Sequence, residues 1–341
     1  MRIGERRIGP GHPPYVIAEL GVNHDGDRDR ALHLVNAARA AGADAIKVQW
    51  FEADRLLSRA ARLARYQEIS GASDPFDLLR GLELDPGVIA EIVEQSVAAG
   101  LATIATLFSV DHVDAAVRCG FDAFKTASPD VVNRPLIDAL VATGRPLLVS
   151  TGAATLAEVE AVTGWLGAHD HVLMHCVSAY PTPDDMACLA GRAAMCRINR
   201  NALGYSDHTM AQDTGALAVA GGACVLEKHL TLDRTAPGPD HAMSLDPDGF
   251  ARYVRLAHRA HRMLGAPTKA PLAIELDVRE VSRQSVTARC ELPAGHVIAP
   301  GELTLKRPGG GIEPSRLAET VGRRLARPVA ANTPLRDEDL A

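Results

Sequence analysis

The sequence predicts an α/β fold, a (β/α)8 TIM barrel followed by a small β-rich domain. Three observations lead to this prediction. Eight short apolar runs alternate with helical stretches between residue 15 and about residue 264. This is the number and order of strands and helices that a (β/α)8 barrel requires. Polar residues gather at the C-terminal end of these runs, where barrel enzymes build their sites. After residue 280 the pattern changes to short alternating strands broken by Pro and Gly.

The expected strands are apolar runs of similar length. They lie at residues 15–21, 44–51, 101–108, 122–128, 146–152, 171–178, 202–208 and 223–232. The expected helices between and after them lie at residues 29–42, 86–100, 113–119, 135–142, 156–166 and 247–264. The 29–42 stretch has apolar residues at helical spacing, and 86–100 opens with Pro and ends with Gly, as helices often do. A doubly wound open sheet is the alternative, but GVNHDGD is not the glycine-rich phosphate turn that it needs after the first strand.

The chain is expected to divide into a catalytic barrel, residues 1–265, and a small C-terminal domain, residues 281–341. Residues 266–280 carry Pro and charge between these two parts and are interpreted as a linker. The small domain has little core of its own, and modules of this size often depend on docking against another surface.

Composition excludes several classes of function. The formal net charge of -6 does not suggest a nucleic-acid surface. No run approaches the roughly 18 apolar residues that a membrane helix needs. The N-terminus, MRIGERRIGPGHPP, has no apolar core after its basic residues and is not a signal peptide. The six cysteines form no Cys-x-x-Cys pair, which favours reduced thiols in a cytoplasmic protein.

Cations and hydroxyls at the strand ends predict an anion site. The cations are Lys47, Lys125 and Lys228, and the hydroxyls belong to Thr106, Ser128, Ser150 and Thr151. Ammonium groups and short hydroxyl donors that meet at one end of a barrel can bind a phosphate and a carboxylate. The set therefore indicates a small, doubly anionic substrate. The alternative is that these lysines pair with carboxylates at the strand ends.

A pair of histidines ends the last two expected strands, in GYSDHT and VLEKHLTL. His208 and His229 would be neighbours in a barrel, and two imidazoles with open positions suit a catalytic divalent metal ion. Glu19, on the first strand, would lie beside the eighth and could orient a metal-bound water or act as a base. Asp207 and Asp240 are candidate partners of the metal ligands or the substrate. A histidine that is only hydrogen-bonded, or a general base, remains the alternative for each.

These motifs, in this order along the chain, identify a resemblance. They include IAELGVNHDGD, AGADAIKVQWFEADRL, FKTAS, HCVSAYPTP, GYSDHT, EKHLTLDRTAPGPDH and KRPGGGI. The sequence resembles the sialic acid synthases, which condense phosphoenolpyruvate with N-acetylmannosamine or a related sugar. The C-terminal part resembles the antifreeze-like (SAF) domain of that family. The resemblance implies a domain-swapped homodimer in which this domain covers the partner's barrel.

The resemblance also implies a role for each matching position. His208 and His229 would bind the metal ion, Mn²⁺ or Mg²⁺, with Glu19 as the catalytic acidic residue beside it. The phosphoenolpyruvate-binding residues would be Lys47, Thr106, Lys125, Ser128, Ser150 and Ser206. The sugar-binding residues would be Gln49, Tyr180, Asp240 and Arg307, the last delivered from the partner's small domain.

Two departures from the family pattern leave the acceptor sugar open. Ser178 stands where members often carry Asn, and Ala72 falls where some have an acceptor-binding Asn. The acceptor could therefore be N-acetylmannosamine, a 2,4-diacetamido sugar, mannose or mannose 6-phosphate. Three other functions compete: a lyase that uses a lysine Schiff base, a non-catalytic binding protein, and an octulosonate-phosphate synthase acting on a sugar phosphate.

Overall fold

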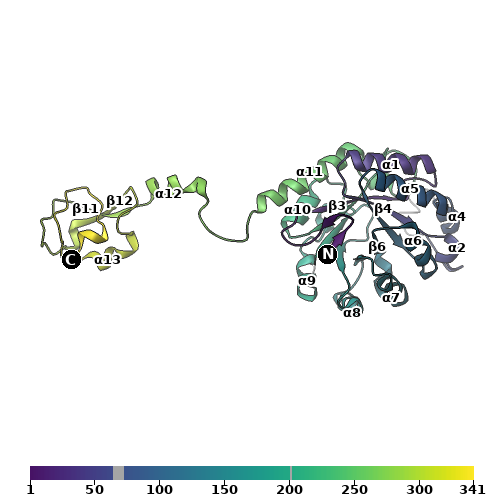
Figure 1. Ribbon diagram of the computed structural model, residues 1–341, viewed down its shortest axis with the longest axis horizontal. Helices are drawn as coiled ribbons and strands as arrows, with labels where there is room; N and C mark the ends of the chain where they lie inside the picture. Colours follow the sequence, from purple (N-terminus) through teal and green to yellow (C-terminus); the bar gives the residue numbers. More distant parts are fainter. Residues whose placement is uncertain (64–72, 200–201) are drawn as a thin grey trace. The chain divides into compact units, whose positions relative to one another are not determined.

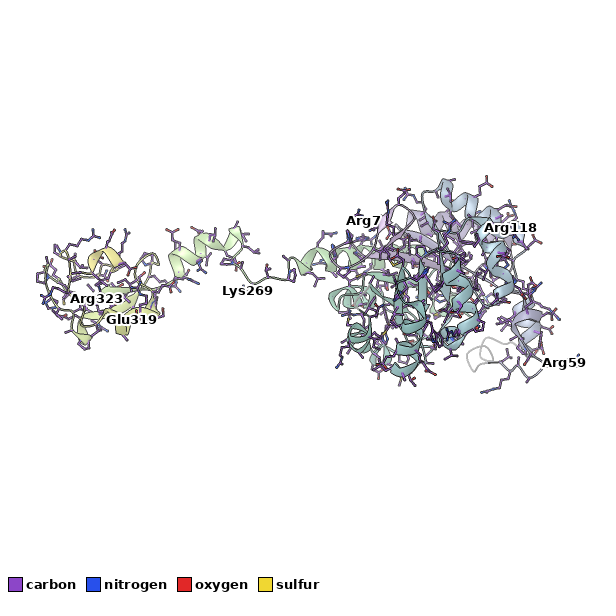
Figure 2. The ribbon with its side chains drawn as sticks, turned by 60° about the horizontal axis from the view of Figure 1, so that its bottom comes forward. Arg7, Arg59, Arg118, Lys269, Glu319 and Arg323 are labelled. Atoms are coloured by element: carbon purple, nitrogen blue, oxygen red, sulfur yellow. The ribbon has the colours of Figure 1, made fainter. Side chains whose placement is uncertain are left out.

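The computed structural model describes residues 1–63, 73–199 and 202–341 and divides the chain into two compact units (Figure 1). They are Met1–Gly265 and Ala266–Ala341. Charged side chains such as Arg118 and Arg323 lie exposed on their own units (Figure 2). Ala72, which the sequence analysis singled out, lies outside the described residues.

The first unit is built on a closed parallel barrel. Its strands are β3 (Tyr15–Gly21), β4 (Ala45–Trp50), β5 (Ala102–Leu107), β6 (Ala123–Thr126), β7 (Leu147–Ser150), β8 (His171–Cys176), β9 (Leu203–Asp207) and β10 (Val225–His229). Each pairs with the next, and β10 closes on β3 from Val225 beside Tyr15 to His229 beside Glu19. The predicted TIM barrel is confirmed, and the open sheet is excluded.

Helices surround the barrel. They are α1 (Arg28–Ala40), α2 (Ala53–Leu56), α4 (Pro75–Arg80), α5 (Pro86–Ala98), α6 (Val113–Cys119), α7 (Arg134–Ala142), α8 (Leu156–Leu166), α9 (Gly191–Ile198), α10 (Thr214–Ala220) and α11 (Pro247–Leu264). Local signals begin them: Asp85 caps α5 ahead of Pro86, and Thr155 and Glu158 form a capping box on α8. The expected helices agree within two residues, whereas α2, α4, α9 and α10 were not delimited from the sequence.

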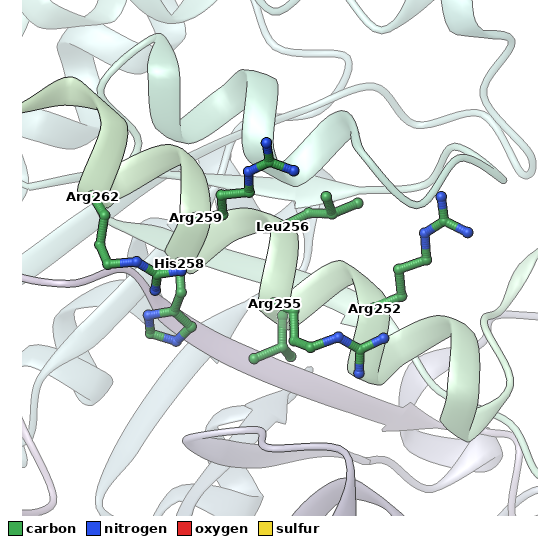
Figure 3. Close-up of a pocket in the computed structure, with 7 residues that line it drawn as sticks. Arg252, Arg255, Leu256, His258, Arg259 and Arg262 are labelled. Carbon is green, nitrogen blue, oxygen red and sulfur yellow. The ribbon is translucent and has the colours of Figure 1, made fainter.

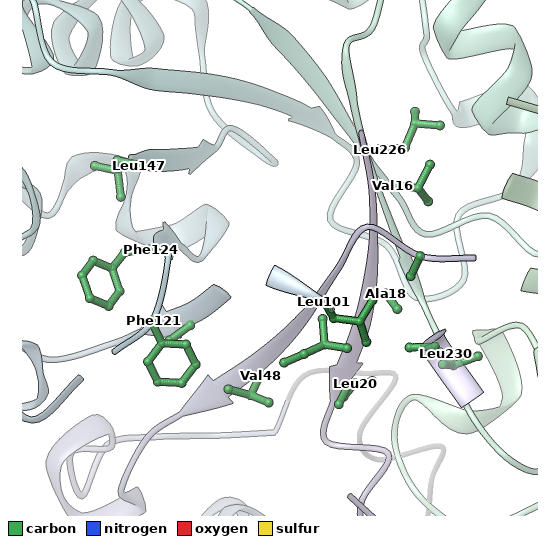
Figure 4. Packing of buried hydrophobic residues seen from close by; sticks show 14 of the residues in the cluster. Val16, Ala18, Leu20, Val48, Leu101, Phe121, Phe124, Leu147, Leu226 and Leu230 are labelled. Carbon is green, nitrogen blue, oxygen red and sulfur yellow. The ribbon is translucent and has the colours of Figure 1, made fainter. Parts of the chain in front are cut away.

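The barrel strands separate two apolar layers. Outward residues such as Val16, Ala18 and Leu226 pack against the helices (Figure 4). Inward residues fill the lower barrel, and Ile3 and Ile8, from the N-terminal hairpin of β1 (Arg2–Ile3) and β2 (Arg6–Arg7), pack against them. This end of the barrel is filled, whereas the pocket opens at the C-terminal ends of the strands.

The second unit has its own small core. Val286, Leu292, Ile298, Leu325 and Leu335 are among its buried residues. They lie around the pair β11 (Ser285–Ala288) and β12 (Leu303–Lys306), with α13 (Leu317–Thr320) and several isolated bridges. The second unit is therefore β-rich, as predicted.

The segment 266–280, predicted as a linker, contains regular structure. It holds a 3-10 turn, Ala273–Glu275, and the start of α12 (Leu276–Ser282). Ile274, Val278 and Val281 are 85%, 60% and 53% exposed. The 3-10 turn and α12 therefore present apolar side chains to solvent. Among the helices that the structure describes, none is long and apolar enough to cross a membrane.

Candidate functional site

A pocket of about 370 Å³ opens at the C-terminal ends of the barrel strands. The site residues expected from the sequence that line it are Glu19, Lys47, Gln49, Thr106, Lys125, Ser128, Ser150, Tyr180, Ser206, His208, His229 and Asp240. Arg307 belongs to the second unit, where it lies exposed just after β12. The volume falls in the range of small-molecule sites.

A second pocket, of about 620 Å³, lies on the outer side of the barrel unit (Figure 3). Its lining comes from α11 alone and includes Arg252, Arg255, His258, Arg259 and Arg262. Among the described residues that line it, there is no strand-end residue and no pair of groups suited to acid–base or metal chemistry. The functional site is therefore placed at the barrel mouth.

Four buried charges form the centre of the mouth. Lys47 Nζ lies 2.7 Å from Glu19 Oε2 and 4.0 Å from Glu227 Oε1, and Lys125 Nζ lies 2.8 Å from Glu227 Oε1. Burial disfavours the Lys125 ammonium, but Glu227 outweighs it and raises the pKa of Lys125. Burial likewise opposes ionisation of Glu227, yet Lys125 and Lys47 lower its pKa. Each of the two lysines is paired with a carboxylate, as the alternative interpretation of these cations expected.

Glu227 was missed in the sequence, and Lys228 was chosen in its place. Side chains alternate along a strand, so Val225, Glu227 and His229 of β10 share the inward side. Lys228 points the opposite way, and the prediction that it faces the site is wrong. The signal was present, because the inward placement of His229 already requires Glu227 to face inward as well.

Lys228 belongs to the layer between barrel and helices. Its ammonium donates to the carbonyl oxygen of Thr209, lies 3.2 Å from Asp207 Oδ2, and sits 5.6 Å from the ring centre of Tyr253. Burial lowers the pKa of Lys228, and Asp207 opposes that shift. Asp207 faces the same layer, so its expected role beside the metal or substrate is also wrong.

Small polar groups surround Gly152 on the β6–β8 side of the pocket. The Gly152 N–H donates to Ser128 Oγ at 3.2 Å, and the Cys176 sulfur lies 3.3 Å from Ser128 Oγ and 3.5 Å from Ser150 Oγ. A Cβ at position 152 would lie 2.2 Å from Ser178 Oγ. Thr151, expected in this set, points away and donates to the Met174 carbonyl at 3.0 Å. The hydroxyls of this cradle can donate to an anion.

The two histidines lie side by side above the charges. Their ring centres are 5.6 Å apart, and the ring of Tyr180 lies 4.3 Å from that of His208. His208 Nδ1 donates to the Val177 carbonyl at 2.8 Å, and His229 Nδ1 lies 3.3 Å from Asp240 Oδ2. This leaves Nε2 of each ring available, and such partners on the other nitrogen are typical of metal-binding histidines.

The charge state of His208 suits a nearby cation. Burial, and then the neighbouring His229, lower the pKa of His208 to about 3, so its imidazole is neutral near pH 7. In the described part of the chain there is no group of three or more His, Cys, Asp or Glu that could hold a metal ion. A metal ion held by the two Nε2 atoms would need its other ligands from water or substrate, as in an open site rather than a closed structural one.

Apolar side chains line the remaining side of the pocket, and sequence reasoning missed them. They are Val22, Leu78, Leu79, Leu82 and Phe108, which pack with Phe51 into a small cluster of their own. We refer to these five residues as the apolar wall. Their spacing in the sequence does not group them, because they come from the ends of β3 and β5 and from the α4 region.

Comparisons with known proteins agree with this architecture. Residues 34–269 match the NeuB family, and residues 283–341 match the SAF domain. The N,N'-diacetyllegionaminic acid synthase of Legionella pneumophila is 36% identical over 94% of this chain and 93% of that protein. The human N-acetylneuraminate-9-phosphate synthase is 30% identical over 98% of this chain and 94% of that protein.

A solved structure is similar as well. The N-acetylneuraminic acid (sialic acid) synthetase of Leptospira borgpetersenii, in complex with citrate, aligns with a TM-score of 0.75 at 30% identity. The alignment covers 82% of this chain and 94% of that one.

Proposed function

The chain belongs to the NeuB family, and we propose that it condenses phosphoenolpyruvate with an aldose of the mannosamine type to give a nonulosonic (sialic) acid and phosphate. The observation that carries the proposal is one pocket that combines paired lysines, a hydroxyl cradle and two histidines with free Nε2 atoms. An anionic enol phosphate and a carbonyl acceptor are the substrates that these groups can hold together.

Phosphoenolpyruvate would lie over β6–β9. Lys47, Lys125 and Thr106 reach its carboxylate and phosphate from below, while Ser128, Ser150 and Ser206 donate to its oxygens. Because Lys125 is paired with Glu227 in the structure, the substrate anion must share or replace that partner. Two ammonium groups that are already desolvated and held in place need little reorganisation on binding.

The acceptor would occupy the rest of the mouth. Gln49, Tyr180 and Asp240 are proposed to contact its polar groups, with its aldehyde beside His208 and His229. These two histidines would hold Mn²⁺ or Mg²⁺, which when bound would polarise the aldehyde oxygen as a Lewis acid. Holding both substrates in attack geometry is worth several kcal/mol of the barrier, about 7–11 kcal/mol in the best-oriented cases.

The proposed reaction forms one carbon–carbon bond and breaks one carbon–oxygen bond. C3 of phosphoenolpyruvate attacks the aldehyde carbon, and the aldehyde oxygen takes up a proton from solvent. Water adds to the cationic C2 and gives its proton to Glu19, which Gln49 orients through a hydrogen bond of 3.0 Å. The C2–O bond to phosphate then breaks as the new C2 hydroxyl gives up its proton and becomes the ketone. That proton leaves with the phosphate, whose charge Lys47 and Lys125 offset.

The test is phosphate release from phosphoenolpyruvate, with Mn²⁺ or Mg²⁺ and a panel of acceptors. N-acetylmannosamine, mannose, mannose 6-phosphate and a 2,4-diacetamido-trideoxy sugar are each assayed with and without EDTA. Metal-dependent release with at least one sugar is expected. Phosphoenolpyruvate binding without release from any sugar would favour a non-catalytic binding protein.

The lysines argue against a Schiff-base lyase. That chemistry needs a lysine of lowered pKa in the pocket, whereas Glu227 raises the pKa of Lys125. Lys228 does have a lowered pKa, but it faces the helices. Borohydride is therefore expected to trap no adduct with pyruvate.

Gly152→Ala is expected to raise the KM for phosphoenolpyruvate at least about tenfold, because the new methyl group would fill the cradle between Ser178 and Ser128. Steady-state kinetics at saturating acceptor measure this effect. Gly164→Ala on α8, whose Cβ would meet nothing within 4 Å, is the matched control. Equal KM values in the two variants would show that the cradle does not bind phosphoenolpyruvate.

We also propose that the protein is a domain-swapped homodimer, with Arg307 delivered to the sugar's acyl group in the partner's barrel. The exposed apolar side chains of this segment, Ile274 in the 3-10 turn and Val278 in α12, support a partner surface for it. Sedimentation of the full chain measures the oligomeric state, and a monomer at assay concentration would contradict the proposal.

Arg307→Ala is expected to raise the KM for the sugar at least about tenfold with little change in the KM for phosphoenolpyruvate, since one hydrogen-bonded cation would be lost from the acceptor side. Arg323→Ala, also exposed in the second unit, is the control. An unchanged sugar KM in Arg307→Ala would show that Arg307 does not contact the sugar.

A further inference from the structure

The two strand ends that carry the histidine pair are joined on the side that faces the helices. In the ladder between β9 and β10, the last residue pair is Asp207 beside Lys228. His208 and His229 come immediately after these two residues. The spacing between the two imidazoles therefore depends on how the ends of β9 and β10 are held together.

Side chains make this connection at the end of the ladder. Lys228 Nζ lies 3.2 Å from Asp207 Oδ2, and it also donates to the carbonyl oxygen of Thr209. Asp207 Oδ1 accepts from the backbone N–H of Thr209 at 2.9 Å and from its hydroxyl at 2.8 Å. Because His208 lies between Asp207 and Thr209, both of its neighbours in the chain are bound to Lys228 of β10. We refer to Asp207, Thr209 and Lys228 as the strand-end network.

The strand-end network is buried and has partners around it. Thr209 is 0% exposed, Thr214 Oγ1 of α10 lies 3.0 Å from Thr209 Oγ1, and the Tyr253 ring of α11 lies 5.6 Å from Lys228 Nζ. A buried ion pair can often be replaced by apolar side chains without loss of stability. What the ion pair and its hydrogen bonds provide, and apolar side chains do not, is a defined relative position of two chain segments.

The partners of the imidazole rings do not supply this restraint. His208 Nδ1 is bound by the Val177 carbonyl, which follows β8, and His229 Nδ1 faces Asp240 in the segment after β10. Each contact orients one ring on its own. The strand-end network, in contrast, joins the backbone on both sides of His208 to the residue that precedes His229.

We propose that the strand-end network positions the metal site, because it sets the distance between the Nε2 atoms of His208 and His229 that a single cation requires. The inference rests on the proposed function, which makes these two histidines the metal ligands. Lys228 and Asp207 touch neither metal nor substrate in this account, and neither lines the pocket. Residues that hold metal ligands in place without touching the metal affect its affinity by about 10- to 100-fold.

The affinity of the full chain for Mn²⁺, measured without substrates, tests the inference. The EPR signal of free Mn²⁺ gives the Kd of wild type, Lys228→Met and the double variant Lys228→Met/Asp207→Leu, and urea unfolding gives the stability of each. Lys228→Met is expected to raise the Kd at least about tenfold. The double variant is expected to regain stability but to keep the raised Kd, because Thr209 has lost its contacts with both side chains.

Arg6→Met is the matched control for lost stability. Arg6 pairs with Asp44, directly before β4, at the opposite end of the barrel strands, so this change also leaves a carboxylate without its cation. It is expected to lower stability and to leave the Kd for Mn²⁺ unchanged. A rise in Kd as large as that of Lys228→Met would contradict the inference, because affinity would then follow stability alone.

A milder substitution applies if Lys228→Met does not fold. Thr209→Val removes the hydroxyl bond to Asp207 at 2.8 Å and keeps the ion pair with Lys228. The Kd for Mn²⁺ is expected to rise by about two- to tenfold, the effect of one hydrogen bond. A wild-type Kd in Thr209→Val would then contradict the inference.

The outcomes separate this inference from the proposed function. A wild-type Kd in both Lys228→Met and the double variant would overturn the inference and leave the proposed function standing. If the wild-type protein binds no Mn²⁺, or if His229→Ala binds it as tightly as wild type, the metal site of the proposed function is refuted, and the inference with it.

Discussion

Replacing His229 with alanine is expected to lower kcat by at least about 10³-fold, and His208→Ala should do the same. The proposed metal ion has two protein ligands, and losing either removes several kcal/mol of stabilisation at the acceptor carbonyl. The affinity for phosphoenolpyruvate should change much less, because the lysines and serines that hold it are untouched. Turnover and phosphoenolpyruvate binding by calorimetry, each measured with saturating Mn²⁺, give the two numbers.

The control for this prediction is another histidine of the same unit. His258→Ala lies on α11, in the outer pocket (Figure 3), and is expected to leave turnover unchanged. Turnover of His229→Ala within about tenfold of wild type would mean that the histidine pair does not bind a catalytic metal ion.

Lys228→Met is expected to destabilise the fold by about 3–5 kcal/mol, because it leaves Asp207 as an unpaired charge in a buried layer. Lys228 and Asp207 have side chains that are 1% and 0% exposed, so water cannot compensate. Urea unfolding at pH 7 measures the change. The folded variant should bind phosphoenolpyruvate as wild type does, since Lys228 faces away from the pocket.

A second substitution separates charge from packing. Lys228→Met combined with Asp207→Leu removes the orphaned carboxylate, and the double variant should recover most of the lost stability. If Lys228→Met has normal stability but has lost phosphoenolpyruvate binding, Lys228 is part of the binding site and this interpretation is wrong.

Periodicity was enough to predict the barrel and most of its mouth. Apolar runs and helix-end signals located the strands, and the polar residues at their ends, from Glu19 to His229, do meet in one pocket. The prediction for Lys228 was wrong because every polar residue at a strand end was assumed to point its side chain into the barrel. Applying the two-residue alternation to β10 would have exchanged it for Glu227.

Other features depend on contacts between distant segments and could not be predicted in this way. The pairing of Lys125 with Glu227 joins residues on strands that are not neighbours in the barrel. The apolar wall depends on where α4 packs, and its leucines resemble any buried helix face in the sequence. The closeness of Gly152 to the Ser178 hydroxyl depends on how the residues that follow β7 and β8 are placed in space.

The central claim is a condensation at the barrel mouth that breaks the C2–O bond of phosphoenolpyruvate. The most direct test uses phosphoenolpyruvate labelled with ¹⁸O in the bridging oxygen, incubated with Mn²⁺ and the preferred acceptor. Mass spectrometry of the products should find the label in the released phosphate. Label retained in the sugar acid would show cleavage of the P–O bond, and phosphate release without an acceptor would show simple hydrolysis; either result would contradict the mechanism.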